Sequence, residues 1–422
     1  MIAGYNPTPM SNTPSDITPA APLAEHLLRP QIRNFQPTGF EKDGKSFVLL
    51  RDPSMLTEQQ MAVMPQVLQL VLLFQGRETL DEIAAKTQAP MHLLQDLVTR
   101  MDEVGLIWGP RFEELERVAK AKITAHGHFP ISCSASMGKD AQTCSEQMDK
   151  WLSEMEDPEI DGTILGLVAP HLDYQRGWPG YAAAYRALKK DQKPDRVIIL
   201  GTNHFGIGDG VVVSEYGFMT PLGKASADKT MLAFLEKTLG SKRIYADQID
   251  HLGEHSVQMH IPWLQHFYGD VPLLAALIPN PLVPPVADDD ERATTAQFVA
   301  AIRTALTEIG GRTLLIASSD LSHVGPQFGD QGQITDAASN EIEQMDRQRL
   351  AAYCNKDTTG FEAIFAKDQN RTRWCSVGNM LAAQAILRPD NVDLIDYQQV
   401  RDPNGISLVS SAALAFSSST RK

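Results

Sequence analysis

Paired cysteines, basic clusters and long apolar runs are all missing from this 422-residue sequence. No apolar run reaches the roughly 18 residues that a membrane-spanning helix needs, so no membrane segment is expected. The four cysteines form no CxxC pair and are too few for a disulfide framework in a chain of this length. A reducing, cytoplasmic compartment is therefore predicted, in which a thiol is available as a metal ligand or a nucleophile.

Basic residues are also fewer than acidic ones. The chain has 38 basic and 52 acidic residues, which gives a formal net charge of −14. No cluster of Lys and Arg could neutralise nucleic-acid phosphates, so nucleic-acid binding is excluded. The sequence also lacks GxGxxG, P-loop, HExxH and GxSxG motifs, which argues against a dinucleotide fold, a P-loop nucleotidase, a zincin and a serine hydrolase. A protein that handles small molecules or protein partners fits this composition.

The length of the chain favours two domains. Residues 1–25 are rich in proline and polar residues and predict a disordered tail. Residues 111–127 predict a helical connector. Between these segments, residues 28–110 predict a small winged-helix-like module, because the apolar spacing changes from strand to helix and back: a strand at Ser46–Arg51, helices at Glu58–Phe74, Thr79–Lys86 and Met91–Val104, and a short strand at Gly105–Gly109.

The module resembles the PqqD-like winged-helix segments that grip peptides beside maturation enzymes, and the resemblance lies in the pattern of Gly76–Ala84. It implies a protein-docking role. A structural cap on the main domain is the open alternative. A DNA-reading role is disfavoured, because acids outnumber bases between Arg51 and Arg111.

Residues 128–418 alternate short apolar strands with helical patterns. This alternation predicts an α/β domain with a mostly parallel sheet covered by helices on both faces. In such sheets the ligand site forms at the carboxyl ends of the strands. The expected strands are Thr163–Pro170, Arg196–Thr202, Val211–Ser214, Leu273–Ile278, Arg312–Ser319, Asp393–Tyr397 and Ser407–Phe416.

Three of these strands end in residues that could carry chemistry. His171 follows the first, His204 follows the second, and Asp320 with His323 follows the fifth. A single histidine is more often structural than functional. Three strands that deliver histidines to one edge of a sheet indicate a metal site or a proton-transfer site.

Two further segments place polar residues where helices begin. Glu254 and His255 open a helix, and we expect them to support the ligands rather than bind the metal themselves. Cys375 precedes another helix, whose N-terminus favours a thiolate ligand or nucleophile. A buried, inert thiol is the alternative for Cys375, and it is the expected state of Cys133, Cys144 and Cys354.

Taken in order, these segments resemble the Memo family, including the bacterial members called AmmeMemoRadiSam system protein B. The resemblance spans roughly residues 125–418 and is specific as a set. It rests on Ala169–Tyr174, Leu200–His204, Thr220–Gly223, Glu254–Pro262, Ser318–His323, and Cys375 with Gly378.

The resemblance implies a fold similar to class III extradiol dioxygenases (LigB-like) and one transition-metal ion, with iron or copper favoured and zinc as a further option. His171, His204 and Cys375 match the ligands, and His323 matches the acid/base histidine, with Asp320 beside it to orient it. Asp173, Glu254 and His255 fall beside the ligands, and Asp173 either joins the metal or hydrogen-bonds to a ligand.

The implied activity is that of a metal-dependent oxidoreductase acting on a small molecule or peptide, with a radical-SAM enzyme and an AMMECR-like protein as partners. The alternative is a metal-free module that recognises a peptide or a phosphorylated ligand. Imidazole and thiolate ligands suit iron, copper and zinc better than magnesium or calcium.

The sequence departs from the family pattern at three places. Leu172-Asp173 stands where many members have Ala-Gly, Gln258 stands where a glutamate is usual, and Ser132–Ser136 replaces an aromatic segment. These differences bear on the substrate more than on the metal.

Overall fold

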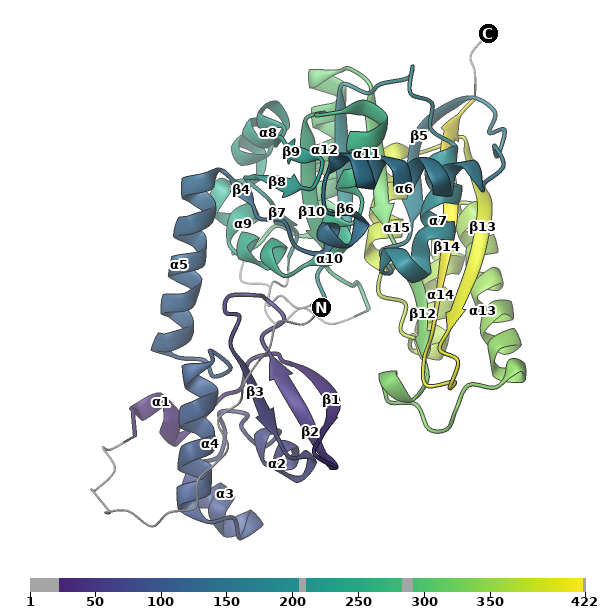
Figure 1. The fold of residues 1–422 in the computed structure, drawn as a ribbon. Helices are drawn as coiled ribbons and strands as arrows, with labels where there is room; N and C mark the ends of the chain where they lie inside the picture. Colours follow the sequence, from purple (N-terminus) through teal and green to yellow (C-terminus); the bar gives the residue numbers. More distant parts are fainter. Residues whose placement is uncertain (1–22, 205–209, 283–290, 420–422) are drawn as a thin grey trace. The chain divides into compact units, whose positions relative to one another are not determined.

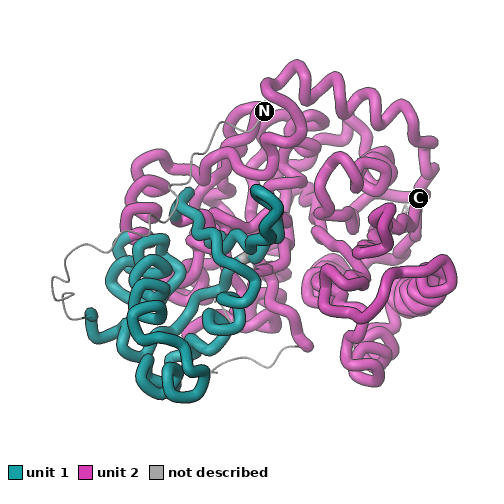
Figure 2. The backbone as a smooth tube through the Cα atoms, turned by 60° about the horizontal axis from the view of Figure 1, so that its bottom comes forward, with its two compact units in different colours: residues 1–52, 57–114 teal, residues 53–56, 115–422 magenta. Residues whose placement is uncertain are grey.

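The computed structural model describes residues 23–204, 210–282 and 291–419. The chain divides into two compact units (Figure 2): unit 1 holds residues 1–52 and 57–114, and unit 2 holds residues 53–56 and 115–422. The expected disordered tail lies outside the described residues up to residue 22. No helix in the described part of the chain is long and apolar enough to cross a membrane.

Unit 1 is a three-stranded antiparallel sheet packed with helices. Strands β1 (Gln36–Lys42) and β2 (Lys45–Arg51) are joined through Asp43 and Gly44, which both have positive φ, as a two-residue hairpin turn requires. Thr79 and Glu82 form a capping box at the start of α3. The remaining elements are α1 (Glu25–Leu28), β3 (Gln60–Val63), α2 (Pro65–Val71), α3 (Leu80–Thr87) and α4 (Met91–Glu103).

Two expectations for this unit were wrong. The helix expected at Glu58–Phe74 begins as strand β3, in which alternate residues Met61 and Val63 are buried, and the helix starts only at Pro65. A proline is favoured at the first position of a helix, so it sets this boundary. The strand expected at Gly105–Gly109 forms only one bridge, between Ile107 and Ile32.

Unit 2 is built on an eight-stranded mixed sheet, counted over the described residues, with the order β12-β14-β5-β11-β6-β10-β7 and β13 paired to β14 (Figure 1). The α/β prediction is confirmed, and every strand expected in this unit is present. Strands β5, β11, β6 and β10 pair in parallel. The pairings toward both edges of the sheet are antiparallel. The bounds are β5 (Thr163–Ala169), β6 (Arg196–Thr202), β7 (Val212–Val213), β10 (Leu273–Ile278), β11 (Thr313–Ser318), β12 (Asp320–Val324), β13 (Asn391–Arg401) and β14 (Leu408–Ser418).

Helices cover both faces of this sheet. Successive strand residues point to opposite faces, so Val197 and Ile199 join one core cluster while Ile198 and Leu200 join the other. The first cluster includes α6 (Ala141–Ser153), α7 (Tyr174–Arg186) and α11 (Ile261–Tyr268). The second includes α8 (Lys229–Leu239), α12 (Thr295–Ile309), α13 (Asp336–Cys354), α14 (Thr358–Asp368) and α15 (Val377–Leu387).

Smaller elements complete unit 2. Helix α5 (Pro110–His126), which begins in unit 1 and continues into unit 2, lies where the connector was expected. A small sheet joins β4 (His128–Phe129), β8 (Gly217–Thr220) and β9 (Gly223–Ala225). The rest are short helices: η1 (Cys133–Met137), α9 (Ser241–Tyr245), η2 (Gln248–Leu252), α10 (His255–Gln258) and η3 (Pro326–Phe328).

The strand register aligns the ends of the central strands. Ser318 of β11 pairs with Ala169 of β5, and Ala317 pairs with Leu200 of β6. The residues that follow β5, β6 and β11 therefore emerge at the same edge of the sheet.

A buried histidine in the first core should make unit 2 sensitive to acid. His260 is fully buried beside Tyr181 and Tyr185, the Tyr185 hydroxyl lies 3.1 Å from its Nδ1, and burial lowers the pKa of His260 from 6.5 to about 3. The unfolded chain takes up a proton on His260 near pH 6.5, whereas the folded chain does so only near pH 3. The stability contributed by neutral His260 is therefore complete above pH 6.5 and is lost progressively as the pH falls from 6.5 toward 3. Between pH 7 and pH 5, His260→Gln should lose about 2 kcal/mol less unfolding free energy than the wild type.

Urea unfolding at the two pH values measures this difference. His126→Gln provides the matched control, because it removes an exposed imidazole without touching the core. Equal losses in the wild type and His260→Gln would contradict the argument.

Candidate metal centre

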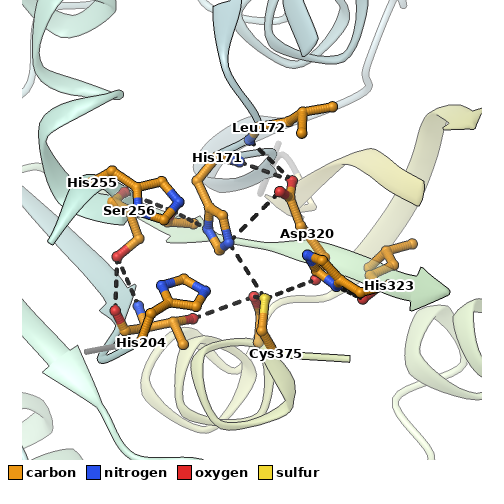
Figure 3. A network of polar contacts seen from close by, with 12 residues as sticks. His171, Leu172, His204, His255, Ser256, Asp320, His323 and Cys375 are labelled. Carbon is orange, nitrogen blue, oxygen red and sulfur yellow. Dashed lines mark hydrogen bonds and ion pairs between the residues drawn. The ribbon is translucent and has the colours of Figure 1, made fainter. Parts of the chain in front are cut away.

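Three histidines from separate elements converge at the carboxyl ends of the central strands (Figure 3). His171 follows β5, His204 follows β6, and His255 is the first residue of α10. One ring nitrogen of each lies within 4.8 Å of the other two. The ring centroids are 4.9–5.3 Å apart. This spacing brings three imidazoles within reach of one metal ion.

Polar contacts at Nδ1 orient all three rings. The Ser318 hydroxyl donates to the backbone carbonyl of Ser256 at 2.6 Å, so its oxygen is left to accept from Nδ1–H of His171 at 2.9 Å. The Nε2 atom of His171 therefore carries a free lone pair. Nδ1 of His204 and Nδ1 of His255 lie 3.0 and 3.2 Å from one oxygen of Glu254. A partner at one ring nitrogen prepares the other for metal binding.

Glu254 places a buried negative charge behind two of the histidines. Its carboxylate is 1% exposed and also accepts the backbone N–H groups of His204 at 2.7 Å and Ser256 at 2.8 Å. Burial opposes ionisation, but the charge and hydrogen bonds of His204 hold the pKa of Glu254 well below its usual range. The centre therefore contains a fixed negative charge that a bound cation would balance.

The three imidazoles differ in their affinity for protons. Burial, followed by the nearby His204 and His255, lowers the pKa of His171 well below its ordinary value, and burial lowers the pKa of His255 to about 4. Burial also lowers the pKa of His204, but the Glu254 carboxylate and Cys375 outweigh it and raise that pKa well above 6.5. A metal must therefore compete with a proton at His204, whereas His171 and His255 are neutral at neutral pH.

Cys375 and Asp320 approach the same nitrogen of His171. The Cys375 sulfur lies 3.4 Å from His171 Nε2 and 3.1 Å from the Ser376 hydroxyl, in the loop before α15. One Asp320 oxygen accepts the backbone N–H groups of His171 and Leu172, and the other lies 3.7 Å from His171 Nε2. Burial raises the pKa of Asp320 to about 7. The structure thus brings the thiol and the carboxyl group that the sequence singled out to one imidazole.

His323 is held by the backbone, whereas Asp320 was expected to orient it. Its Nδ1 lies 3.0 Å from the carbonyl of Leu321 and 3.2 Å from that of Arg373, so Nδ1 carries the proton and Nε2 is free. Burial lowers the pKa of His323 to about 4. It is therefore a neutral imidazole at neutral pH, and the nearby His204 and His255 lower its pKa further.

Comparison with known proteins decides the family. The family model described as "Memo-like protein" matches residues 135–415, which is more than half of the chain.

The chain belongs to the Memo family.

Relatives within the Memo family support this assignment. A MEMO1 family protein of Pyrobaculum aerophilum is 31% identical over 250 residues, which are 59% of this chain and 81% of the relative. One from Methanopyrus kandleri is 32% identical over 264 residues, covering 60% and 83%. One from Methanothermobacter thermautotrophicus is 30% identical over 246 residues, covering 57% and 80%.

Two of the departures from the Memo pattern contact each other. Gln258 is fully buried, its Oε1 accepts the backbone N–H of Ser132 at 3.2 Å, and its Nε2 donates to the carbonyl of Pro130 at 3.4 Å. A glutamate could not donate to Pro130. The amide of Gln258 therefore ties the backbone at Pro130 and Ser132 to the last residue of α10.

The third departure, Asp173, caps a helix. Its carboxylate accepts the backbone N–H of Arg176 at 3.2 Å and the Nε–H of the same residue at 2.6 Å, and 44% of the side chain is exposed. These contacts hold the first turn of α7.

The sequence reasoning underestimated His255 and missed Ser318. His255 was expected beside the ligands, but the structure groups it with His171 and His204 as a residue that could hold the metal. Ser318 gave one weak signal, its place at the end of β11 two residues before Asp320.

Proposed function

We propose that this Memo domain binds one transition-metal ion and acts as a metal-dependent oxidoreductase. His171, His204 and His255 would hold the metal through Nε2, and Cys375 would add a thiolate. The observation that carries the proposal is the convergence of three imidazoles whose Nδ1 atoms are all occupied by Ser318 or Glu254.

The donor set narrows the choice of metal. Imidazole and thiolate are borderline-soft ligands that fit iron, copper or zinc, whereas magnesium and calcium need oxygen ligands. Iron and copper are favoured by the Memo resemblance, whereas a closed set of three histidines and Cys375 would also suit zinc. When bound, iron or copper would supply one-electron chemistry and Lewis acidity.

The surrounding residues would manage protons. His323 is neutral at neutral pH and presents Nε2, so it can accept a proton from a substrate group. Asp320 fixes the backbone of His171 through two hydrogen bonds and, with a pKa of about 7, can hold or release a proton beside it. His323 would thus accept a proton from the substrate, and Asp320 would hold or release one beside His171.

Partners and substrate belong to the same proposal. The Memo resemblance favours a small molecule or a peptide as the substrate, and a radical-SAM enzyme and an AMMECR-like protein as the partners. Unit 1 is proposed to dock a protein of that pathway.

Metal content of anaerobically purified protein tests the proposal. We expect about one iron or copper ion per chain, and an oxidation-state change of that metal on exposure to oxygen, visible by electron paramagnetic resonance. Absence of bound metal, together with no tight binding of added Fe(II), Cu(I) or Zn(II), would overturn it in favour of a recognition module. Tight binding of zinc alone would overturn the redox assignment.

A further inference from the structure

A buried carboxylate behind the centre receives four hydrogen bonds. Asp346 of α13 is fully buried. One of its oxygens accepts from the Ser322 hydroxyl at 2.6 Å and from the Trp374 indole N–H at 2.9 Å. The other accepts from the Ser410 hydroxyl at 2.5 Å and from the Tyr397 hydroxyl at 2.9 Å. A buried charge that accepts this many bonds is firmly fixed in place.

Arg349 compensates the charge of Asp346. It lies one turn further along α13, is 1% exposed, and its guanidinium is 3.5 Å from the Asp346 carboxylate. It also donates to the Thr372 hydroxyl at 2.7 Å and pairs with Asp368. A buried charge pair costs little only when further hydrogen bonds satisfy it, as they do here.

Two of the residues bound to Asp346 immediately precede residues of the metal centre. Ser322 precedes His323 on β12, and Trp374 precedes Cys375. The loop between α14 and α15 also accepts the backbone N–H of His323, at the carbonyl of Thr372 and a distance of 2.7 Å. Asp346 therefore holds two chain segments that are about 50 residues apart in sequence.

The loop that carries Cys375 needs such support. Gln369, Asn370 and Arg373 have φ values of 54°, 51° and 57°, in the left-handed region that side chains other than glycine rarely adopt. Conformations of this kind persist only where the surroundings hold them. Trp374 is fully buried, and its indole is bonded to both Asp346 and Ser322.

We infer that Asp346 is a positioning residue of the metal centre, which sets Cys375 and His323 at once by binding the residue before each. The inference rests on the proposed function for its effect on a metal. None of the hydrogen bonds described for His171, His204 and His255 leads directly to Asp346, so its influence falls on the Cys375 and His323 side of the centre.

Two single variants provide a matched test, because each removes one donor to the same carboxylate. Trp374→Phe removes the indole N–H donor beside Cys375. Tyr397→Phe removes a hydroxyl donor on β13, outside the loop that carries Cys375. In metal-free protein, Trp374→Phe should speed amide hydrogen exchange in residues 320–324 and 370–376 by about tenfold, while Tyr397→Phe leaves both segments at the wild-type rate. Asp346→Ala should speed exchange in both segments further.

A metal-loaded arm separates this inference from the proposed function. With Co(II) as the probe, Trp374→Phe should lose the thiolate-to-metal charge-transfer absorption of Cys375 and bind about tenfold more weakly, whereas Tyr397→Phe keeps both properties. If the wild type binds no Co(II), the proposed function fails, and the exchange result alone decides the positioning role. Equal exchange rates in Trp374→Phe and Tyr397→Phe, or an increase spread evenly over unit 2, would overturn the role of Asp346.

Discussion

Replacing His171 by alanine should lower the affinity of the domain for a transition metal by about a thousandfold, equivalent to roughly 4 kcal/mol. His171 lies next to each of the other three proposed ligands, His204, His255 and Cys375. Its Nε2 faces Cys375 at 3.4 Å, its ring borders both other histidines, and its backbone is fixed by Asp320. The loss should therefore appear whatever the separate contributions of His255 and Cys375 to metal binding.

Competition with a metal indicator dye measures the affinity, and thermal unfolding of the metal-free protein confirms that the variant folds. His323→Ala is the matched control: it removes a half-buried histidine of the same region that is held by carbonyls, and its affinity should stay within about threefold of the wild type. His255→Ala and Cys375→Ala then rank the remaining ligands, since a true ligand reproduces the His171→Ala loss. Metal binding by His171→Ala at wild-type affinity would contradict the site.

The sequence alone was sufficient to predict the residues of the centre that follow the ends of strands. An apolar strand that stops at a polar residue places that residue at the sheet edge, and parallel neighbours share that edge. His171, His204 and Asp320 could be predicted on this basis, because the register of β5, β6 and β11 aligns their ends.

Features that depend on tertiary packing could not be read in the same way. His255 joins the other histidines because α10 packs beside β6, where the Ser256 hydroxyl bonds the backbone of Thr202. The antiparallel edges of the sheet arise from the β13–β14 hairpin and from β12, which begins at Asp320, where the sequence pattern predicted only the residues that follow a strand. Neither the helix packing nor the change of strand direction has a local pattern.

Replacing Glu254 by glutamine should weaken metal binding by about a hundredfold. Among the described residues, the groups seen to face this carboxylate are donors: the backbone and Nδ1 of His204, Nδ1 of His255, and the backbone of Ser256. An amide has only one acceptor oxygen, so its NH2 group must face a donor in either orientation. At least one imidazole then loses its support, and the negative charge that would balance the cation is removed.

The pH dependence of metal binding should also differ between the wild type and Glu254→Gln. In the wild type, affinity should rise with pH through the neutral range, because the Glu254 carboxylate raises the pKa of His204 and the metal must displace that proton. Without the carboxylate this pKa falls, so in Glu254→Gln the affinity should be weaker at every pH and should rise less steeply with pH. Dye competition between pH 6 and 8 measures both effects, with Glu236→Gln, an exposed carboxylate bonded to Tyr245, as the control that keeps the wild-type profile. A Glu254→Gln profile parallel to that of the wild type would show that His204 does not carry the competing proton, and an unchanged affinity would remove Glu254 from the centre.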